Sequence, residues 1–316
     1  MSHDTMHEIR VDVPFRLDLT VSALRRTSAN LVDVYTRDGR YLRALGGFST
    51  PVVVCVTQSA PNVLLVSSAG LDDAAEVTGP VLATVRRMLG TERGLSEFYR
   101  HARKVPWLEP LAHRTRGLRP PRYPALFEAC ANAILFQQVS LQAASAIMRR
   151  VLRAVGTPIE HDRIPLVVFP SAEQFLRADG AVIRAAGVSE GKLATLRRAA
   201  EAIASGALDE ASLSELPSGD AAQMLRGIKG IGAWTAAVIL LRGLGRLDVF
   251  PGGDSGVAAN VARVAGEPLD VAPIAASLGS QRGMLYFCLL LARLEERGEL
   301  GTVSEVARRA RDENDT

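Results

Sequence analysis

The residues best placed to do chemistry lie in one stretch of the C-terminal half. Asp254 follows Pro251-Gly252-Gly253, a run that cannot continue a helix, so the aspartate is expected in a loop at the start of the next helical segment. A carboxylate held there can stabilise positive charge that develops on a substrate, and it can orient or deprotonate a water molecule. The same position also suits a plain N-cap for the helix that begins at Ser255. The two roles are compatible.

A tight glycine turn lies upstream of Asp254. The chain turns through Lys229-Gly230-Ile231-Gly232 between a short helical pattern and an apolar helix over residues 233–241. Glycine supplies the backbone freedom that such a turn needs. At the start of the second helix, the amides of Gly230, Gly232 and Thr235 can point at an anion, and a nucleic-acid phosphate is the natural ligand. The pattern predicts a helix-hairpin-helix whose contact with nucleic acid is independent of sequence.

The length and composition of the whole chain limit the kinds of fold that could position these residues. Its 316 residues suggest two domains, and a net charge of +3 permits a local nucleic-acid-binding patch without requiring one. Cys55, Cys130 and Cys288 are far apart in apolar surroundings, which favours buried thiols over a disulfide framework or a metal site. No apolar run is long enough to span a bilayer, so we expect no membrane association and a cytoplasmic protein that joins the nucleoid when it acts on DNA.

The N-terminal third reads as strands followed by a helix. Apolar residues alternate over residues 9–19, and Asp38-Gly39 is a strong hairpin signal between strands at 31–36 and from Arg40. The remaining expected elements are strands at 52–57 and 63–67 and a helix at 81–89. This order predicts a small antiparallel sheet with helix cover. The proline- and arginine-rich segment 104–124 is expected to connect it to the rest.

From Ala125 onward the pattern is helical throughout. Short loops with glycine or proline separate helices expected at 125–136, 141–154, 172–178 (behind a capping box of Ser171 and Gln174), 192–204, the hairpin pair, 255–264, 272–278 and 283–297. The predicted fold class is therefore α+β: an N-terminal antiparallel sheet domain with its linker over residues 1–112, and an all-α domain over residues 113–316.

The stretch 225–257 resembles the helix-hairpin-helix, Gly/Pro-rich loop and aspartate of the DNA glycosylase superfamily, most closely its 3-methyladenine DNA glycosylase II (AlkA-type) branch. The resemblance implies a monomer that flips a damaged base out of double-stranded DNA and excises it. It also implies that Asp254 is the catalytic carboxylate and that alkylated purines of the 3-methyladenine and 7-methylguanine type are the substrates. The N-terminal sheet domain is part of the same architecture in this branch.

Further positions take roles from the same resemblance. Residues 134–140 resemble the turn that pushes a side chain into the DNA stack, with Gln138 at the wedge position, while Lys229 is expected to face the DNA backbone. Trp234 matches one aromatic position of the base pocket. Val238 stands where the branch has tyrosine, and Gln281 belongs to the segment that carries a tryptophan there, so the pocket is expected to differ in shape.

The reaction is expected to be monofunctional. Glycosylases with lyase activity carry a lysine where this chain has Trp234, and an amine is needed to form a Schiff base. No cofactor is required by this reading, although the family often holds a monovalent cation, Na⁺ or K⁺, at the hairpin; here the carbonyls of Arg226, Ile228 and Ile231 would supply it. Two alternatives stay open: a non-catalytic damaged-DNA-binding or architectural protein, and a glycosylase for hypoxanthine or oxidised bases.

Overall fold

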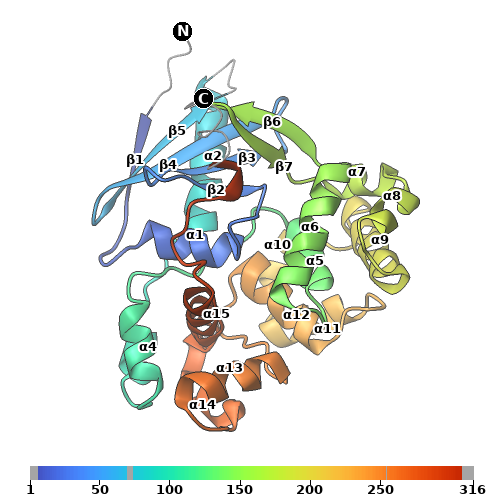
Figure 1. The fold of residues 1–316 in the computed structure, drawn as a ribbon. Coiled ribbons are helices and arrows are strands. Elements are labelled where there is room, and N and C mark those ends of the chain that lie inside the picture. Colours follow the sequence, from blue (N-terminus) through green and yellow to red (C-terminus); the bar gives the residue numbers. More distant parts are fainter. Residues whose placement is uncertain (1–5, 70–73, 254, 308–316) are drawn as a thin grey trace.

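The computed structural model describes residues 6–69, 74–253 and 255–307. An N-terminal sheet lies above a body of helices (Figure 1). The five strands pair antiparallel in the order β1-β5-β4-β3-β2. They are β1 (Met6–Arg10), β2 (Asp33–Tyr35), β3 (Tyr41–Leu45), β4 (Val52–Ala60) and β5 (Val63–Ala69). The α+β fold class is confirmed, as is the Asp38-Gly39 hairpin, where Gly39 takes a φ of 81°.

The strand predicted over residues 9–19 is wrong beyond Arg10. β1 ends there, and α1 (Leu17–Arg25) begins seven residues later. Eight of the nine residues of α1 are buried, so the helix has no solvent-facing side that would mark it as a surface helix. The apolar residues at alternate positions of this segment therefore gave the pattern of a strand although part of it is a helix.

The helices that follow agree with the predicted pattern in most places. They are α2 (Ala74–Leu89), α3 (Ser96–Ala102), α4 (Leu108–Arg114), α5 (Leu126–Leu135), α6 (Leu141–Val155), α7 (Ala172–Arg177), α8 (Gly180–Ala185), α9 (Glu190–Ala204), α10 (Glu210–Glu215), α11 (Ser218–Arg226), α12 (Ala233–Ile239), α13 (Ser255–Ala265), α14 (Val271–Ser277) and α15 (Met284–Glu296). A π-helical turn, Leu240–Leu244, extends α12. The capping box at Ser171 and Gln174 is present. The segment expected as a plain connection holds α4.

A second, two-stranded sheet was not predicted. It consists of β6 (Thr157–His161) and β7 (Ile164–Val168), joined through Asp162 and Arg163, whose φ angles of 50° and 62° are those of a tight hairpin turn. Apolar side chains of β7 pack on β2, β3 and β4. The helical part of the chain thereby contributes a small β-ribbon to the face of the N-terminal sheet.

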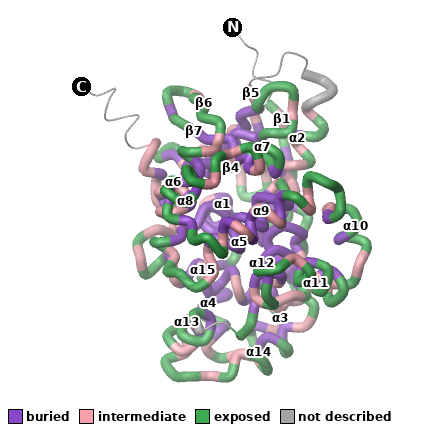
Figure 2. The backbone as a smooth tube through the Cα atoms, turned by 90° about the vertical axis from the view of Figure 1, so that its right-hand side faces the viewer, coloured by how far each residue is buried: buried purple, intermediate pink, exposed green. Residues whose placement is uncertain are grey.

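Buried residues form a continuous interior through α1, α5, α12 and α15 (Figure 2). One apolar cluster joins the sheet to α5, α9 and α12, and another joins α1, α3 and α4 to α13 and α15. The division between residues 112 and 113 stays a prediction, because both clusters draw side chains from either side of it. Within the described ranges, no helix combines the length and apolarity that crossing a bilayer requires.

A buried ion-pair network ties the sheet to α5. Arg43 of β3 donates to Asp33 at 2.6 Å and to Glu128 of α5 at 2.5 Å, and all three side chains are at most 3% exposed. Two carboxylates thus share one guanidinium. Burial, followed by the negative charge of Asp33, raises the pKa of Glu128 to about 7 against the pull of Arg43.

Stability is expected to depend on pH through Glu128. A carboxyl whose pKa rises on folding contributes its full stability below the unfolded value and loses it as pH rises toward the folded value. From pH 5 to 7, the wild-type free energy of unfolding is expected to fall relative to that of Glu128→Gln, by about 2 kcal/mol. Urea unfolding of both proteins at the two pH values measures this difference; parallel pH profiles would contradict it.

Candidate functional site

The turn between α5 and α6 presents Gln138 to solvent. We call residues 136–140 the wedge turn. Gln138 is exposed and has a φ of 53°, a left-handed conformation that is uncommon for a residue other than glycine. Ser140 ends the turn by accepting a hydrogen bond from the Ala143 amide at 3.2 Å, which starts α6. A side chain held outward on a constrained backbone at a loop tip is a candidate for insertion into a partner.

Two long side chains fix the wedge turn from behind. Lys192 of α9 donates through Nζ to the carbonyls of Leu135 at 2.9 Å and Gln137 at 2.8 Å. Gln137 donates through Nε2 to Thr235 Oγ1 at 2.7 Å and to the Gly230 carbonyl at 3.1 Å. The wedge turn is therefore bonded to both α9 and the glycine hairpin. The sequence did not indicate these contacts, because residues about 55 and 100 positions apart form them.

The glycine hairpin has the predicted form. Between α11 and α12, Gly230 takes a φ of 102°, and a Cβ built there would lie 2.0 Å from Thr195 Oγ1 of α9. Gly232 is the N-cap of α12, with open space where its Cβ would be. The amide of Ala236 donates to the Gly232 carbonyl at 3.0 Å, so the amides of residues 233–235 precede the hydrogen-bond ladder of α12.

The side chains around the turn divide between surface and interior. Lys229, Gly230 and Gly232 are exposed, whereas Thr235 is only 2% exposed and its hydroxyl accepts from Gln137. The amide of Thr235, and not its side chain, is thus the group available to an anion. The Ile228 carbonyl accepts the Ile231 amide at 3.0 Å and keeps a second lone pair.

A pocket of about 340 Å³ opens beside the wedge turn and α12. We call it the Trp234 pocket. Its walls come from the wedge turn, the first turn of α12, one face of α13 and one face of α15. The described residues that line it are Arg26, Phe136, Val139, Ser140, Leu141, Trp234, Gly256, Val257, Ala259, Asn260, Arg263, Tyr286, Leu289, Leu290, Arg293 and Arg297.

Asp254 itself lies outside the described residues. The loop before it includes Gly253, whose φ of 78° lies in the region that favours glycine. The helix after it, α13, places Gly256, Val257 and Asn260 on the wall of the Trp234 pocket. The chain on the C-terminal side of Asp254 therefore enters the pocket wall within two residues.

The structure does not bring the other two expected pocket residues to this place. Val238 is 1% exposed and belongs to the core. Gln281 accepts from the Phe98 amide at 2.7 Å and donates to the Gly94 carbonyl at 2.8 Å, so its amide group anchors the start of α3. It lines a different hollow, together with Arg246 and Asp248. The residues that sequence reasoning missed are Arg26, Phe136 and Tyr286, which come from three separate parts of the chain.

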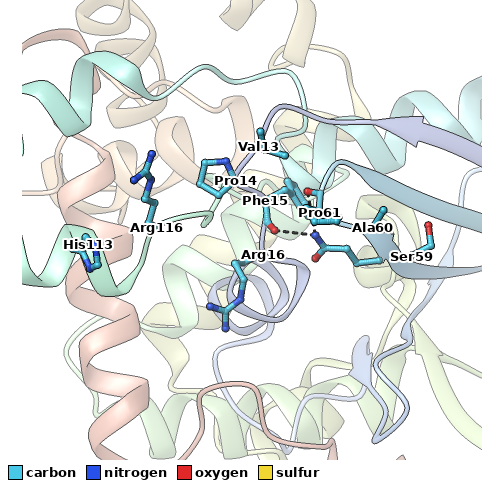
Figure 3. A pocket seen from close by; sticks show the side chains of 10 residues that line it. Val13, Pro14, Phe15, Arg16, Ser59, Ala60, Pro61, His113 and Arg116 are labelled. Carbon is cyan, nitrogen blue, oxygen red and sulfur yellow. Dashed lines mark hydrogen bonds between the residues drawn. The ribbon is translucent and has the colours of Figure 1, made fainter.

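A shallow hollow of the described chain lies elsewhere. It has about 890 Å³ between the loop before α1, the β4–β5 turn and α4, and Figure 3 shows Pro14, Pro61, His113 and Arg116 around it. Gln58 donates to the Phe15 carbonyl there at 2.9 Å and accepts from the Leu17 amide at 3.0 Å. These bonds hold the loop in place, and the lining residues include no carboxylate.

Taken together, a glycine hairpin, a projecting turn bonded to it and a pocket beside that turn, on an α+β scaffold, define a helix-hairpin-helix protein. Residues 131–270 match the family described as the HhH-GPD superfamily base excision DNA repair protein. Over these residues the chain is similar to the helix-hairpin-helix DNA glycosylase superfamily, and the named relatives are those of its AlkA-type branch.

Named relatives agree with this placement. The chain is 30% identical to the DNA-3-methyladenine glycosylase of Bacillus subtilis over 56% of its own length and 58% of that protein. It is 32% identical to the probable bifunctional transcriptional activator/DNA repair enzyme AlkA of Mycobacterium tuberculosis over 70% of its own length and 43% of that protein. The chain thus spans only about half the length of these curated relatives.

A solved structure matches over nearly the whole chain. The 3-methyladenine DNA-glycosylase from Archaeoglobus fulgidus superposes with a TM-score of 0.75 at 25% identity, covering 91% of this chain and 98% of that one. The match includes the N-terminal sheet as well as the helical part, so the two share one architecture.

Proposed function

We propose that the protein is a monofunctional DNA glycosylase of base excision repair. In this proposal it flips a damaged purine out of double-stranded DNA and hydrolyses its N-glycosidic bond with the aid of Asp254. Alkylated purines of the 3-methyladenine and 7-methylguanine type are the first substrate class, by analogy with the named activities of the relatives. Hypoxanthine or an oxidised base is the alternative.

The observation that carries the proposal is the position of the Trp234 pocket. It lies between the wedge turn, the first turn of α12 and the first turns of α13. A base-flipping enzyme needs a side chain that fills the gap in the stack, a grip on the backbone and a pocket for the extruded base. Gln138, the hairpin amides and the Trp234 pocket meet these needs within one surface of linked elements.

The grip on DNA is assigned to the hairpin. The amides of Gly230, Gly232 and Thr235 would bind a backbone phosphate, with Lys229 adding charge nearby. A monovalent cation held by the carbonyls of Arg226, Ile228 and Ile231 fits this assignment, since the Ile228 carbonyl retains a free lone pair. When bound, such a cation would add positive charge beside the phosphate. One hairpin and one wedge serve one flipped base, which is consistent with action as a monomer.

The lack of lyase chemistry is inferred from the positions of the lysine side chains. A Schiff base needs a lysine at the sugar. Trp234 occupies the position at which lyases carry this lysine. The amine of Lys192 donates to two backbone carbonyls behind the wedge turn. The chain's other lysines are Lys104 and Lys229, and Lys229 is exposed at the hairpin.

The test is release of free base from duplexes that carry single defined lesions, with strand integrity followed on the same samples. The proposal expects release of the base and an intact abasic strand, and it expects no covalent trapping by borohydride. Binding to damaged duplex without release of any base would instead favour the non-catalytic, architectural protein. Borohydride trapping would contradict the monofunctional mechanism alone.

Lys192 and Lys229 make a matched pair, because each substitution by methionine removes one positive charge. Lys192→Met is expected to lower the single-turnover excision rate about tenfold, since the wedge turn loses two hydrogen bonds from a charged donor. Lys229→Met is expected to weaken duplex binding and to reduce its salt dependence by about one counterion, with little change in that rate. Equal effects of the two variants on both measurements would contradict the positioning role of Lys192.

A further inference from the structure

Arg26 brings a buried positive charge to the Trp234 pocket from the N-terminal part of the chain. It follows α1 directly, has a φ of 67° and is 4% exposed. Arg242 holds the end of α1 in place by donating to the carbonyls of Ala23 at 2.9 Å and Leu24 at 3.0 Å. The guanidinium of Arg26 lies 4.1 Å from the ring centroid of Phe136 in the wedge turn.

The guanidinium keeps unused donors. Its Nη2 donates weakly to the Tyr286 hydroxyl at 3.4 Å, whereas Nε and Nη1 are buried and have no partner among the described residues. A buried donor without an acceptor costs about 1–3 kcal/mol. Trp234 Nε1 is a second buried donor in the same condition. The side-chain oxygen Oδ1 of Asn260, an acceptor on the pocket wall, already accepts from Arg263 at 2.7 Å. The pocket therefore offers donors in excess of acceptors.

The charged side chains that line the pocket have one sign among the described residues. Arg26, Arg263, Arg293 and Arg297 line it, and no acidic residue does so among those described. Arg263 and Arg293 are paired with Glu296, at 2.6 Å and 3.5 Å. Arg26 has no such partner in the described part of the chain. Moreover, one face of the Phe136 ring is already covered by Arg26 and is closed to a cationic base.

Resting on the proposed function, we propose that Arg26 reads the flipped base. Its Nε and Nη1 groups donate to an acceptor such as an exocyclic carbonyl oxygen, and its charge opposes a base with a fixed positive charge. A neutral 6-oxopurine such as hypoxanthine fits both conditions. 7-Methylguanine offers a carbonyl but carries charge, and 3-methyladenine carries charge without a carbonyl. Arg26 thereby ranks the three lesions in that order, which places the alternative substrate of the proposed function ahead of the alkylated purines.

The experiment measures kcat/KM for base release from duplexes that carry hypoxanthine or 3-methyladenine, with wild type, Arg26→Met and Arg26→Lys. In Arg26→Met, release of hypoxanthine is expected to fall about 10- to 100-fold, as for loss of a hydrogen bond from a charged donor, while release of 3-methyladenine is unchanged or rises. Arg26→Lys keeps the charge and loses the planar donor pair, so both lesions are expected to be released slowly. Binding to an abasic-site analogue, which places no base in the pocket, is expected to stay within about twofold of wild type.

The outcomes separate the two levels of inference. A wild type that releases neither lesion overturns the proposed function and this inference with it. A wild type that releases both, with the ratio between lesions unaltered in Arg26→Met, overturns the reading role alone. A parallel loss of both lesions together with loss of abasic-site binding assigns Arg26 a purely structural role and also overturns it. If Arg26→Met does not fold, Arg26→Lys decides: unchanged release of hypoxanthine contradicts the proposal.

Discussion

Asp254→Asn is expected to abolish base release while DNA binding persists. Cleavage of an N-glycosidic bond builds positive charge on the sugar, as in glycoside hydrolysis. A carboxylate about 4 Å away, at an effective dielectric near 20, stabilises that charge by roughly 4 kcal/mol. This corresponds to a rate factor on the order of a thousand. Asparagine has the same shape and is a good N-cap, so the start of α13 is expected to survive the change.

Single-turnover release of base, with binding to an abasic-site analogue in parallel, measures this prediction. Asp248→Asn is the matched control, because Asp248 is an exposed acid six residues earlier and lines the hollow that contains Gln281, not the Trp234 pocket. We expect Asp248→Asn to excise at the wild-type rate. Retained activity in Asp254→Asn would remove Asp254 from the mechanism, whereas loss of activity in both variants would show that the effect is not specific to Asp254.

Local signals in the sequence were sufficient for the hairpin and its surroundings. Gly230 and Gly232 predicted the turn, and Ser171 with Gln174 predicted a capping box that the structure contains. Such features depend on residues within a few positions of one another, so their physical chemistry can be read directly. The β6–β7 ribbon was missed although Asp162 and Arg163 make a tight turn; its strands contain Pro158 and Pro165, and proline is uncommon inside a strand.

Long-range contacts could not be read in this way. Arg26 carries no local mark of a pocket residue, and it reaches the Trp234 pocket only because α1 packs on α15 and ends against Arg242. Gln281 shows the reverse case. A resemblance placed it in the base pocket, but two backbone hydrogen bonds hold its amide at α3. Pocket composition depends on packing between distant elements, which residue spacing does not encode.

Gly230→Ala is expected to weaken DNA binding strongly. The residue has a φ of 102°, where any side chain is strained, and a new Cβ would lie 2.0 Å from Thr195 Oγ1 and 2.8 Å from its Cγ2. Thr195 cannot yield easily, since it is buried in α9 and its hydroxyl donates to the Gly191 carbonyl at 2.9 Å. The turn must therefore move, and with it the Gly230 carbonyl that accepts from Gln137.

Gly232→Ala is the matched control, because it adds the same methyl group to the turn without strain or overpacking. Gly232 has a φ of −88°, an ordinary value, and nothing lies within 4 Å of where its Cβ would be. The variant is expected to keep wild-type stability, so any loss of DNA affinity would come from the added methyl group at the phosphate contact. Gly230→Ala, by contrast, is expected to lose binding by at least about 100-fold, because strain and overpacking together cost roughly 3 kcal/mol or more.

The two variants also test the bond between hairpin and wedge turn. Gln137 joins them, so displacement of the Gly230 carbonyl is expected to release the wedge turn as well as the phosphate grip. At DNA concentrations that saturate Gly230→Ala, its excision rate should therefore stay below that of Gly232→Ala. Equal rates at saturation would mean that the hairpin binds DNA without positioning Gln138, and that the wedge turn depends on Lys192 alone.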